Sequence, residues 1–442
     1  MAIPPSISLG VEVEFLTAQF RDDRQPDDDL HSRWACGPPS ESPYETASPE
    51  GPHYWAEMSS VLESCKAIAD TGLPTACPYP SEPDALSPII KDAKCASANP
   101  VLKCSNGTSI RTWNNNAVQS SARAGSQAGY WFMTRERHIS VDVRRIPGKS
   151  PSTKYHWHGT ELNSPVLILP IEFDNKLPSL KRCLNAIQNN MKIALNESCG
   201  LHLHVNDNGK LNLDTAKRVA CLVLLLEDPL FYQISHPSRG RSPFSVRISK
   251  DSKAVLEKGA IPKLKGDGAF QITALSALAD KLEGRWKVNK KIIEAMKRIY
   301  AQPDRESLRN ILKKFNEGPV HTTRRCGLVV SCNDTIEFRY PASTFDTDYI
   351  AAWGQLVRHI YGLAMKPANE FSHIICHVYD VVTRGGTAAW DKPARWEDAM
   401  EAIEFRDVGH SEWSRWIEEF NGKLKDLDKQ GPMPRMPRML ID

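Results

Sequence analysis

Leucine and valine alternate with histidine in residues 199–207 (CGLHLHVND), a pattern typical of a strand whose successive side chains face opposite sides of a sheet. His202 and His204 would then share one face, with the apolar side chains on the other. Two histidines on one face of a strand fit core imidazoles satisfied by backbone groups as well as contacts to a metal or a phosphate. The pattern alone leaves both interpretations open.

A second alternation runs through residues 7–16 (ISLGVEVEFL), where the valines face one way and Glu12 and Glu14 face the other. It predicts an inner strand that carries two acids side by side. A surface edge strand with a solvated polar face would show the same pattern.

Further predicted strands carry the remaining candidate residues. Residues 321–340 read as two strands joined by an Asn-Asp turn, and the second places Glu337 and Arg339 on one face. Asp142 lies near the end of another predicted strand, and Glu161 precedes a Ser-Pro turn and an apolar strand. The candidate acids therefore all lie on or beside strands, away from the apolar faces.

Helical periodicity and loop-rich composition account for much of the remaining chain. The expected helices cover residues 54–70, 178–196, 214–226 and 346–365, and Asp214 is expected to cap the third of them. Asp, Pro, Ser and Gly dominate residues 17–52, which predicts an irregular insertion. The segment 236–241 (HPSRGR) reads as a basic, turn-rich loop that either holds a substrate carboxylate or is simply solvated.

The amino-acid composition restricts the classes of molecule that the protein is expected to bind. The 442 residues hold 56 Lys and Arg against 53 Asp and Glu, a balance that does not favour nucleic acid or an anionic membrane. No apolar run approaches the ~18 residues of a membrane helix. The 11 cysteines contain no CxxC pair, which argues against a disulfide framework and a thiolate zinc site. We therefore expect a soluble, cytoplasmic protein that acts on small molecules.

The charges of the candidate site residues restrict which ions and ligands they could bind. Carboxylates ~4 Å apart repel by about 4 kcal/mol per pair at an effective dielectric near 20, so acids that line one cavity require cations. Oxygen ligands with one or two imidazoles suit Mg²⁺ or Mn²⁺ better than zinc, and Mg²⁺ on carboxylates usually accompanies a nucleotide phosphate. Arg339, with Arg324 or Arg325, would then hold phosphoryl oxygens. The chain has neither a Walker loop nor a GxGxxG motif.

The order of four motifs resembles the amidoligase family, which is related to glutamate–cysteine ligase and glutamine synthetase. The motifs are G-V-E-V-E-F, an acid followed by E-L-N-S-P-V-L, C-G-L-H-L-H-V, and T-I-E-F-R before a turn and a helix. The resemblance implies an α+β fold with an antiparallel, funnel-like sheet lined by metal ligands and helices packed behind it. We expect a catalytic domain over residues 7–365, with a Pro/Ser/Asp-rich insertion at about 17–105, and a helical C-terminal extension over residues 366–442.

The same resemblance assigns roles to individual residues. The metal site expected on the substrate side comprises Glu14, Asp142 and Glu161. The site expected to hold the β- and γ-phosphates of ATP comprises Glu12, His202 and Glu337. Arg339 would neutralise the transferred γ-phosphoryl group and His204 would approach a phosphate, so Arg339, His204 and Glu161 are the expected catalytic residues. Asp142 departs from the family pattern, because Arg144 stands where a small hydroxyl residue is expected.

The implied reaction is ATP-dependent formation of an amide bond, with Mg²⁺ or Mn²⁺. A substrate carboxylate attacks the γ-phosphoryl group to give an acyl phosphate and ADP, and an amine then displaces phosphate, so no Ser or Cys nucleophile is needed. The expected partners are small-molecule or peptide carboxylates and amines. Three alternatives remain: a metal-dependent hydrolase built on the H-x-H strand, a phosphotransferase on the same fold, and an inactive binding protein. The sequence leaves the oligomeric state open.

Overall fold

The structure is a computed structural model that describes residues 4, 6–21, 33–38, 54–78, 90–92, 101–104, 107, 109–113, 129–139, 155–168, 170–196, 198–207, 211–241, 245–257, 290–315, 326–383 and 395–430. The chain divides into two compact units. Unit 1 comprises Met1–Leu9, His202–Ala342 and Ala352–Asn421. Unit 2 comprises Gly10–Leu201, Ser343–Ala351 and Gly422–Asp442. Among the described residues, no helix combines the length and apolar character needed to cross a bilayer.

The longest strand that contributes to unit 2 is β1 (Ile7–Phe20). It pairs antiparallel with β7 (Tyr155–Asn163) and with the short β8 (Ile193–Ala194). Strand β7 pairs antiparallel with β6 (Trp131–Arg135). The outer strands are β2 (Thr75–Pro78), β3 (Ile90–Asp92), β4 (Val101–Cys104) and β5 (Ser109–Trp113). Within unit 2, the strand order is β1-β7-β6-β2-β5-β4-β3, with β8 paired to β1.

The sheet is mixed, which corrects the expectation of an antiparallel one. Strand β2 runs parallel to both of its neighbours, β5 and β6, whereas the other pairs described above are antiparallel. Parallel strands cannot be joined by a tight hairpin, and the chain passes through β3 and β4 between β2 and its parallel partner β5; helix α1 (Tyr54–Ala69) precedes β2. Alternation within a single strand cannot show which direction its neighbours run.

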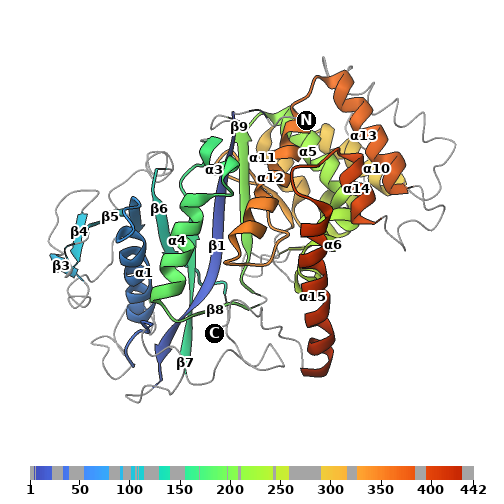
Figure 1. Ribbon diagram of the computed structural model, residues 1–442. Coiled ribbons are helices and arrows are strands. Elements are labelled where there is room, and N and C mark those ends of the chain that lie inside the picture. The colour runs from blue at the N-terminus through green and yellow to red at the C-terminus, as the bar shows by residue number, and fades with distance from the viewer. Residues whose placement is uncertain are drawn as a thin grey trace. The chain divides into compact units, whose positions relative to one another are not determined.

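Helices cover the strands of unit 2, as expected. Helix α1 contacts β2, β5, β6 and β7, and α4 (Pro178–Asn190) packs beside α1 (Figure 1). The apolar side chains of α1 are buried because one face of the helix covers the sheet. Helix α4 begins with Pro178, where the missing N–H costs no helical hydrogen bond. It ends at Asn190, so the helix expected over residues 178–196 is too long. A short helix α3 (Pro170–Asp174) precedes it.

Unit 1 contains the strand that carries the two histidines. Strand β9 (Leu201–Asp207) pairs antiparallel with β11 (Ile336–Phe338), which pairs antiparallel with β10 (Leu328–Val330). The expected turn between β10 and β11 is confirmed, and Asp334 adopts the left-handed conformation there (φ 57°). Leu201, Leu203 and Val205 of β9 are fully buried, as the alternation predicts.

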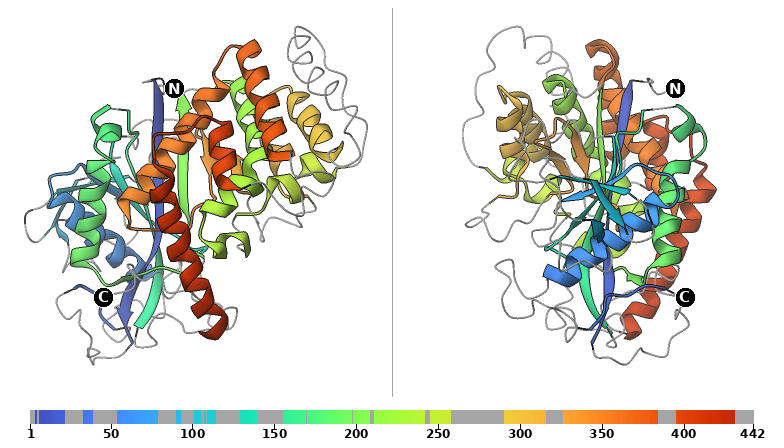
Figure 2. Two further views of the ribbon diagram at one scale, coloured as in Figure 1. Left: turned by 45° about the vertical axis from the view of Figure 1, so that its right-hand side comes forward. Right: turned by 90° about the vertical axis from the view of Figure 1, so that its left-hand side faces the viewer.

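Helices make up most of unit 1. The described helices that lie wholly or mostly in this unit are α5 (Leu213–Leu226), the π-helix η3 (Glu227–Phe231), α6 (Tyr232–Ile234), the 3₁₀ helix η4 (Pro237–Arg241), α7 (Ile248–Asp251), α8 (Lys253–Leu256), α10 (Lys290–Tyr300), α11 (Arg305–Leu312), α12 (Thr347–Ala364), α13 (Ala368–Thr383), α14 (Trp396–Ala402) and α15 (His410–Gln430). Helices α5, α10 and α13 lie side by side (Figure 2). Asn212, not Asp214, caps α5, because its side chain accepts hydrogen bonds from the N–H groups of Asp214 and Thr215.

Candidate active site

Strands β1 and β7 bring acids together in unit 2. Glu14 lies directly opposite Glu161, and Glu12 lies opposite Asn163, so the four side chains share one face of the sheet. The Gly200 N–H donates to Glu14 Oε2 (2.6 Å), and Asn163 Nδ2 donates to Glu161 Oε1 (2.8 Å). Glu14 is buried, while Glu12 and Glu161 are half-buried. The expectation that Glu12 and Glu14 lie on an inner strand is confirmed.

This acidic face affects the protonation of Glu161. Burial raises the pKa of Glu161 well above its usual value, and the negative charges of Glu12 and Glu14 raise it further, whereas the hydrogen bond from Asn163 lowers it. Like charges directly opposite each other on neighbouring strands are destabilising. A proton or a cation relieves that repulsion, and only a cation leaves all three carboxylates ionised.

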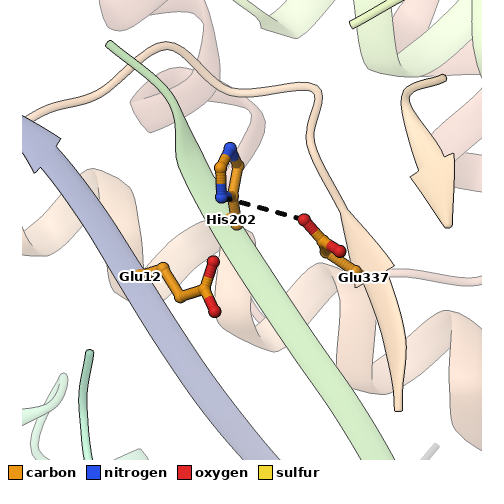
Figure 3. Close-up of side chains that lie close together, drawn as sticks. All are labelled: Glu12, His202 and Glu337. Carbon is orange, nitrogen blue, oxygen red and sulfur yellow. Dashed lines mark ion pairs between the residues drawn. The ribbon is translucent and has the colours of Figure 1, made fainter. Parts of the chain in front are cut away.

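Strands β9 and β11 build a second cluster in unit 1. Glu337 lies directly opposite His204, so Glu337, Arg339, His202 and His204 share one face, as predicted. Arg339 Nη1 pairs with Glu337 Oε1 and lies 3.4 Å from His202 Nδ1. His202 Nδ1 lies 3.8 Å from Glu337 Oε1, the pair marked in Figure 3. His204 Nδ1 bonds to the Thr335 hydroxyl (2.8 Å), which fixes the orientation of its ring.

The second cluster balances its own charge. Glu337, Arg339 and His202 are all buried, with 6%, 4% and 2% of their surface exposed. The guanidinium of Arg339 neutralises the Glu337 carboxylate, which a buried acid requires. The lone pair of His202 Nδ1 can accept a hydrogen bond from Arg339 or bind a metal ion, but it cannot do both at once. The planar fork of Arg339 is the group best suited to phosphate oxygens.

Within unit 2, Glu14 and Glu161 offer ligand atoms within 4.8 Å of each other. Within unit 1, His202 and Glu337 do the same (Figure 3). Carboxylate oxygens with a single imidazole are a donor set that fits Mg²⁺ or Mn²⁺ better than a structural zinc ion. Asp142, Arg324 and Arg325 lie outside the described residues.

Sequence reasoning missed several polar groups around these clusters. Asn163 and Gly200 donate to the acids of β1 and β7, and Thr335 orients His204. Asn163 could have been found, because it stands two residues from Glu161 and so shares its face. The segment 236–241, read as a loop, includes a 3₁₀ helix, and its Arg239 is fully buried and not solvated. Glu161 lies within β7 itself, not before a strand.

The fold and these clusters define a mixed α+β protein with residue groups able to bind a metal ion. Residues 113–265 match the family described as "Putative amidoligase enzyme". The match confirms the resemblance to the amidoligase family, and the family's name supports an enzyme that forms amide bonds. It includes Glu161, His202 and His204, whereas Glu12, Glu14, Glu337 and Arg339 lie outside it. No curated protein and no solved structure gives a significant match.

Proposed function

We propose that this protein is a Mg²⁺- and ATP-dependent carboxylate–amine ligase that forms an amide bond through an acyl phosphate. The observation that carries the proposal is the direct opposition of Glu14 and Glu161 on β1 and β7, with Glu12 raising the pKa of Glu161 further. An arrangement of this kind becomes favourable when cations bind to it. The family match over residues 113–265 supports amide-bond chemistry.

The acids would hold the divalent ions. We assign Glu14 and Glu161, together with Asp142, to the ion on the substrate side. We assign Glu12, His202 and Glu337 to the ion that accompanies the β- and γ-phosphates. When bound, Mg²⁺ or Mn²⁺ would neutralise phosphate charge and fix the orientation of the triphosphate.

The remaining polar side chains would act on the phosphoryl group. Arg339 is buried next to Glu337 and would place its guanidinium against the γ-phosphoryl oxygens as negative charge shifts during transfer. His204, held by Thr335, would donate to a phosphate oxygen. Arg324 or Arg325 would add a second cation. The acid substrate then gains the phosphoryl group, and the amine displaces phosphate from the carbonyl carbon.

We propose small-molecule or peptide carboxylates and amines as the substrates, used by a cytoplasmic enzyme whose catalytic domain covers residues 7–365. An arginine within the histidine cluster favours a phosphate-handling site over a zinc hydrolase, because a guanidinium fork matches phosphoryl oxygens whereas a hydrolytic zinc site would take a further histidine ligand at such a position. A phosphotransferase would use the same groups and differs in its product.

The experiment is a turnover assay on the full chain. The protein is incubated with ATP, Mg²⁺ and a mixture of the proteinogenic amino acids and short peptides, while ADP, phosphate and new masses are followed. A ligase releases ADP and phosphate in equal amounts and produces a mass that corresponds to two components joined with loss of water. A stable phosphorylated product would instead identify a phosphotransferase. Hydrolysis of the peptides with zinc and without ATP would overturn the ligase proposal.

A further inference from the structure

Tyr340 directly follows Arg339, and its ring is confined on several sides within unit 1. It stacks on Phe231, with ring centroids 4.7 Å apart and planes 10° apart, and it meets Tyr232 edge to face at 5.5 Å. A Cβ added to Gly327 would clash with the same ring, so the absence of a side chain there lets the backbone approach it. The ring of Tyr340 therefore has almost no freedom to move.

The hydroxyl of Tyr340 reaches a fully buried acid. It donates to Glu227 Oε1 at 2.7 Å, and the carboxylate also accepts the N–H groups of Ile248 (2.9 Å) and Ser249 (2.7 Å). Glu227 begins the π-helix η3, which also contains Phe231. Short π-helical segments are frequent at functional sites. The carboxylate thus links η3, α7 and the residue that follows Arg339.

Arg239 forms a hydrogen bond with the peptide group that joins Arg339 to Tyr340. Its fully buried guanidinium donates from Nη2 to the carbonyl oxygen of Arg339 at 2.7 Å. The Arg339 N–H donates in turn to the carbonyl oxygen of Gly327 at 2.8 Å. The backbone of Arg339 is therefore held at its N–H, at its C=O and through the next side chain.

We propose that Arg239, Tyr340 and Glu227 are positioning residues that hold the Arg339 guanidinium in the orientation needed for phosphoryl transfer. This inference rests on the proposed function. Buried ionic and polar groups add less stability than apolar groups of similar volume, so packing alone does not require a carboxylate and a guanidinium here. Their hydrogen bonds instead fix the orientation of the backbone at Arg339 and Tyr340, because each hydrogen bond restricts an angle as well as a distance. Positioning of this kind affects the rate of a reaction more than the binding of its substrate.

The test compares two tyrosines of unit 1. Tyr340→Phe removes the hydroxyl that reaches Glu227 and keeps the packed ring. Tyr232→Phe is the matched control, since it removes another hydroxyl of unit 1, which donates to the carbonyl oxygen of Ser245. Both variants are assayed with ATP, Mg²⁺ and the amino-acid and peptide mixture. Tyr340→Phe is expected to lower kcat about tenfold with little change in the KM for ATP, and Tyr232→Phe to change neither by more than about twofold.

A second measurement separates this inference from the proposed function. In protein labelled with ¹⁵N-arginine, the Arg339 Nε–H signal is assigned by its loss in Arg339→Lys. We expect that signal to shift and broaden in Tyr340→Phe but not in Tyr232→Phe, whether or not the protein turns over ATP. Absence of turnover in the wild type, with this difference retained, would reject the ligase proposal alone. Equal kinetics in an active enzyme, or equal Arg339 signals in the two variants, would overturn the positioning role.

Discussion

The two polar clusters differ in whether a positively charged side chain lies beside their acids. On β1 and β7, carboxylates face each other and the pKa of Glu161 rises as a result. On β9 and β11, the acid Glu337 has the guanidinium of Arg339 beside it. The first cluster becomes more stable when a cation or a proton binds, whereas the second is already neutral. Removing one acid should therefore have opposite effects on stability in the two clusters.

The largest expected effect comes from the self-balanced cluster. Glu337→Ala should lower ATP turnover by at least about a thousandfold, because it removes a proposed metal ligand. It also leaves Arg339 buried without this partner, at a cost of about 3 kcal/mol, which a domain of ordinary stability survives. Turnover is measured beside the circular dichroism of the variant. Glu401→Ala, at an exposed acid of α14, is the control. A folded Glu337→Ala with undiminished turnover would remove Glu337 from the site.

The buried acid Glu227 extends the comparison, because its carboxylate accepts hydrogen bonds and is not paired with a positive charge in the way that Glu337 is. Burial raises the pKa of Glu227 to about 7, against the opposing effect of its hydrogen bonds from Ser249, Tyr340 and Ile248. The folded protein then binds a proton that the unfolded chain releases near pH 4.5, so the free energy of unfolding should fall by about 3 kcal/mol as the pH rises from about 4.5 to 7.

Glu227→Gln should remove this part of the pH dependence, because the amide does not titrate. Urea unfolding of the wild type and the variant at several pH values between 4.5 and 8 measures it. The variant is also expected to be less stable at low pH, since an amide nitrogen cannot accept a backbone N–H. Parallel pH profiles for the two proteins would show that Glu227 is ionised throughout this range.

A conservative change at Arg339 tests what kind of charge the second cluster needs. Arg339→Lys keeps the positive charge and loses the planar fork, so turnover should fall by about thirtyfold while the Kd for ATP rises by no more than about threefold. Turnover and equilibrium titration with ATP measure the two effects. Arg305→Lys, at a partly exposed ion pair with Asp334, is the control. Equal losses in turnover and affinity would assign Arg339 to binding alone.

The smallest effect has the opposite sign and comes from the acidic face. Glu12→Gln removes one of the charges that raise the pKa of Glu161, so the metal-free protein should gain about 1 kcal/mol of unfolding free energy at neutral pH. The same change should weaken Mn²⁺ binding, measured by titration calorimetry, because a carboxylate ligand is lost. A variant that is destabilised without metal would contradict the contrast between the two clusters.

Local pattern was enough to determine which side chains share a face. The alternation around Glu12 and Glu14, and around His202 and His204, follows from the two-residue period of a strand, which is a property of the strand itself. The turn at Asp334 follows equally from local chemistry, because Asn and Asp tolerate the left-handed conformation. The order of short motifs also pointed to the family whose model matches residues 113–265.

Tertiary structure alone decided which residues meet. The register that sets Glu14 opposite Glu161, the parallel pairing of β2, and the burial of Arg239 against the Arg339 carbonyl all join residues far apart in the chain. Register and burial depend on those distant partners, and no repeat within a single segment encodes them. Arg239 shows this most clearly, since a basic, turn-rich segment reads as a solvated loop until the surrounding helices and strands enclose it.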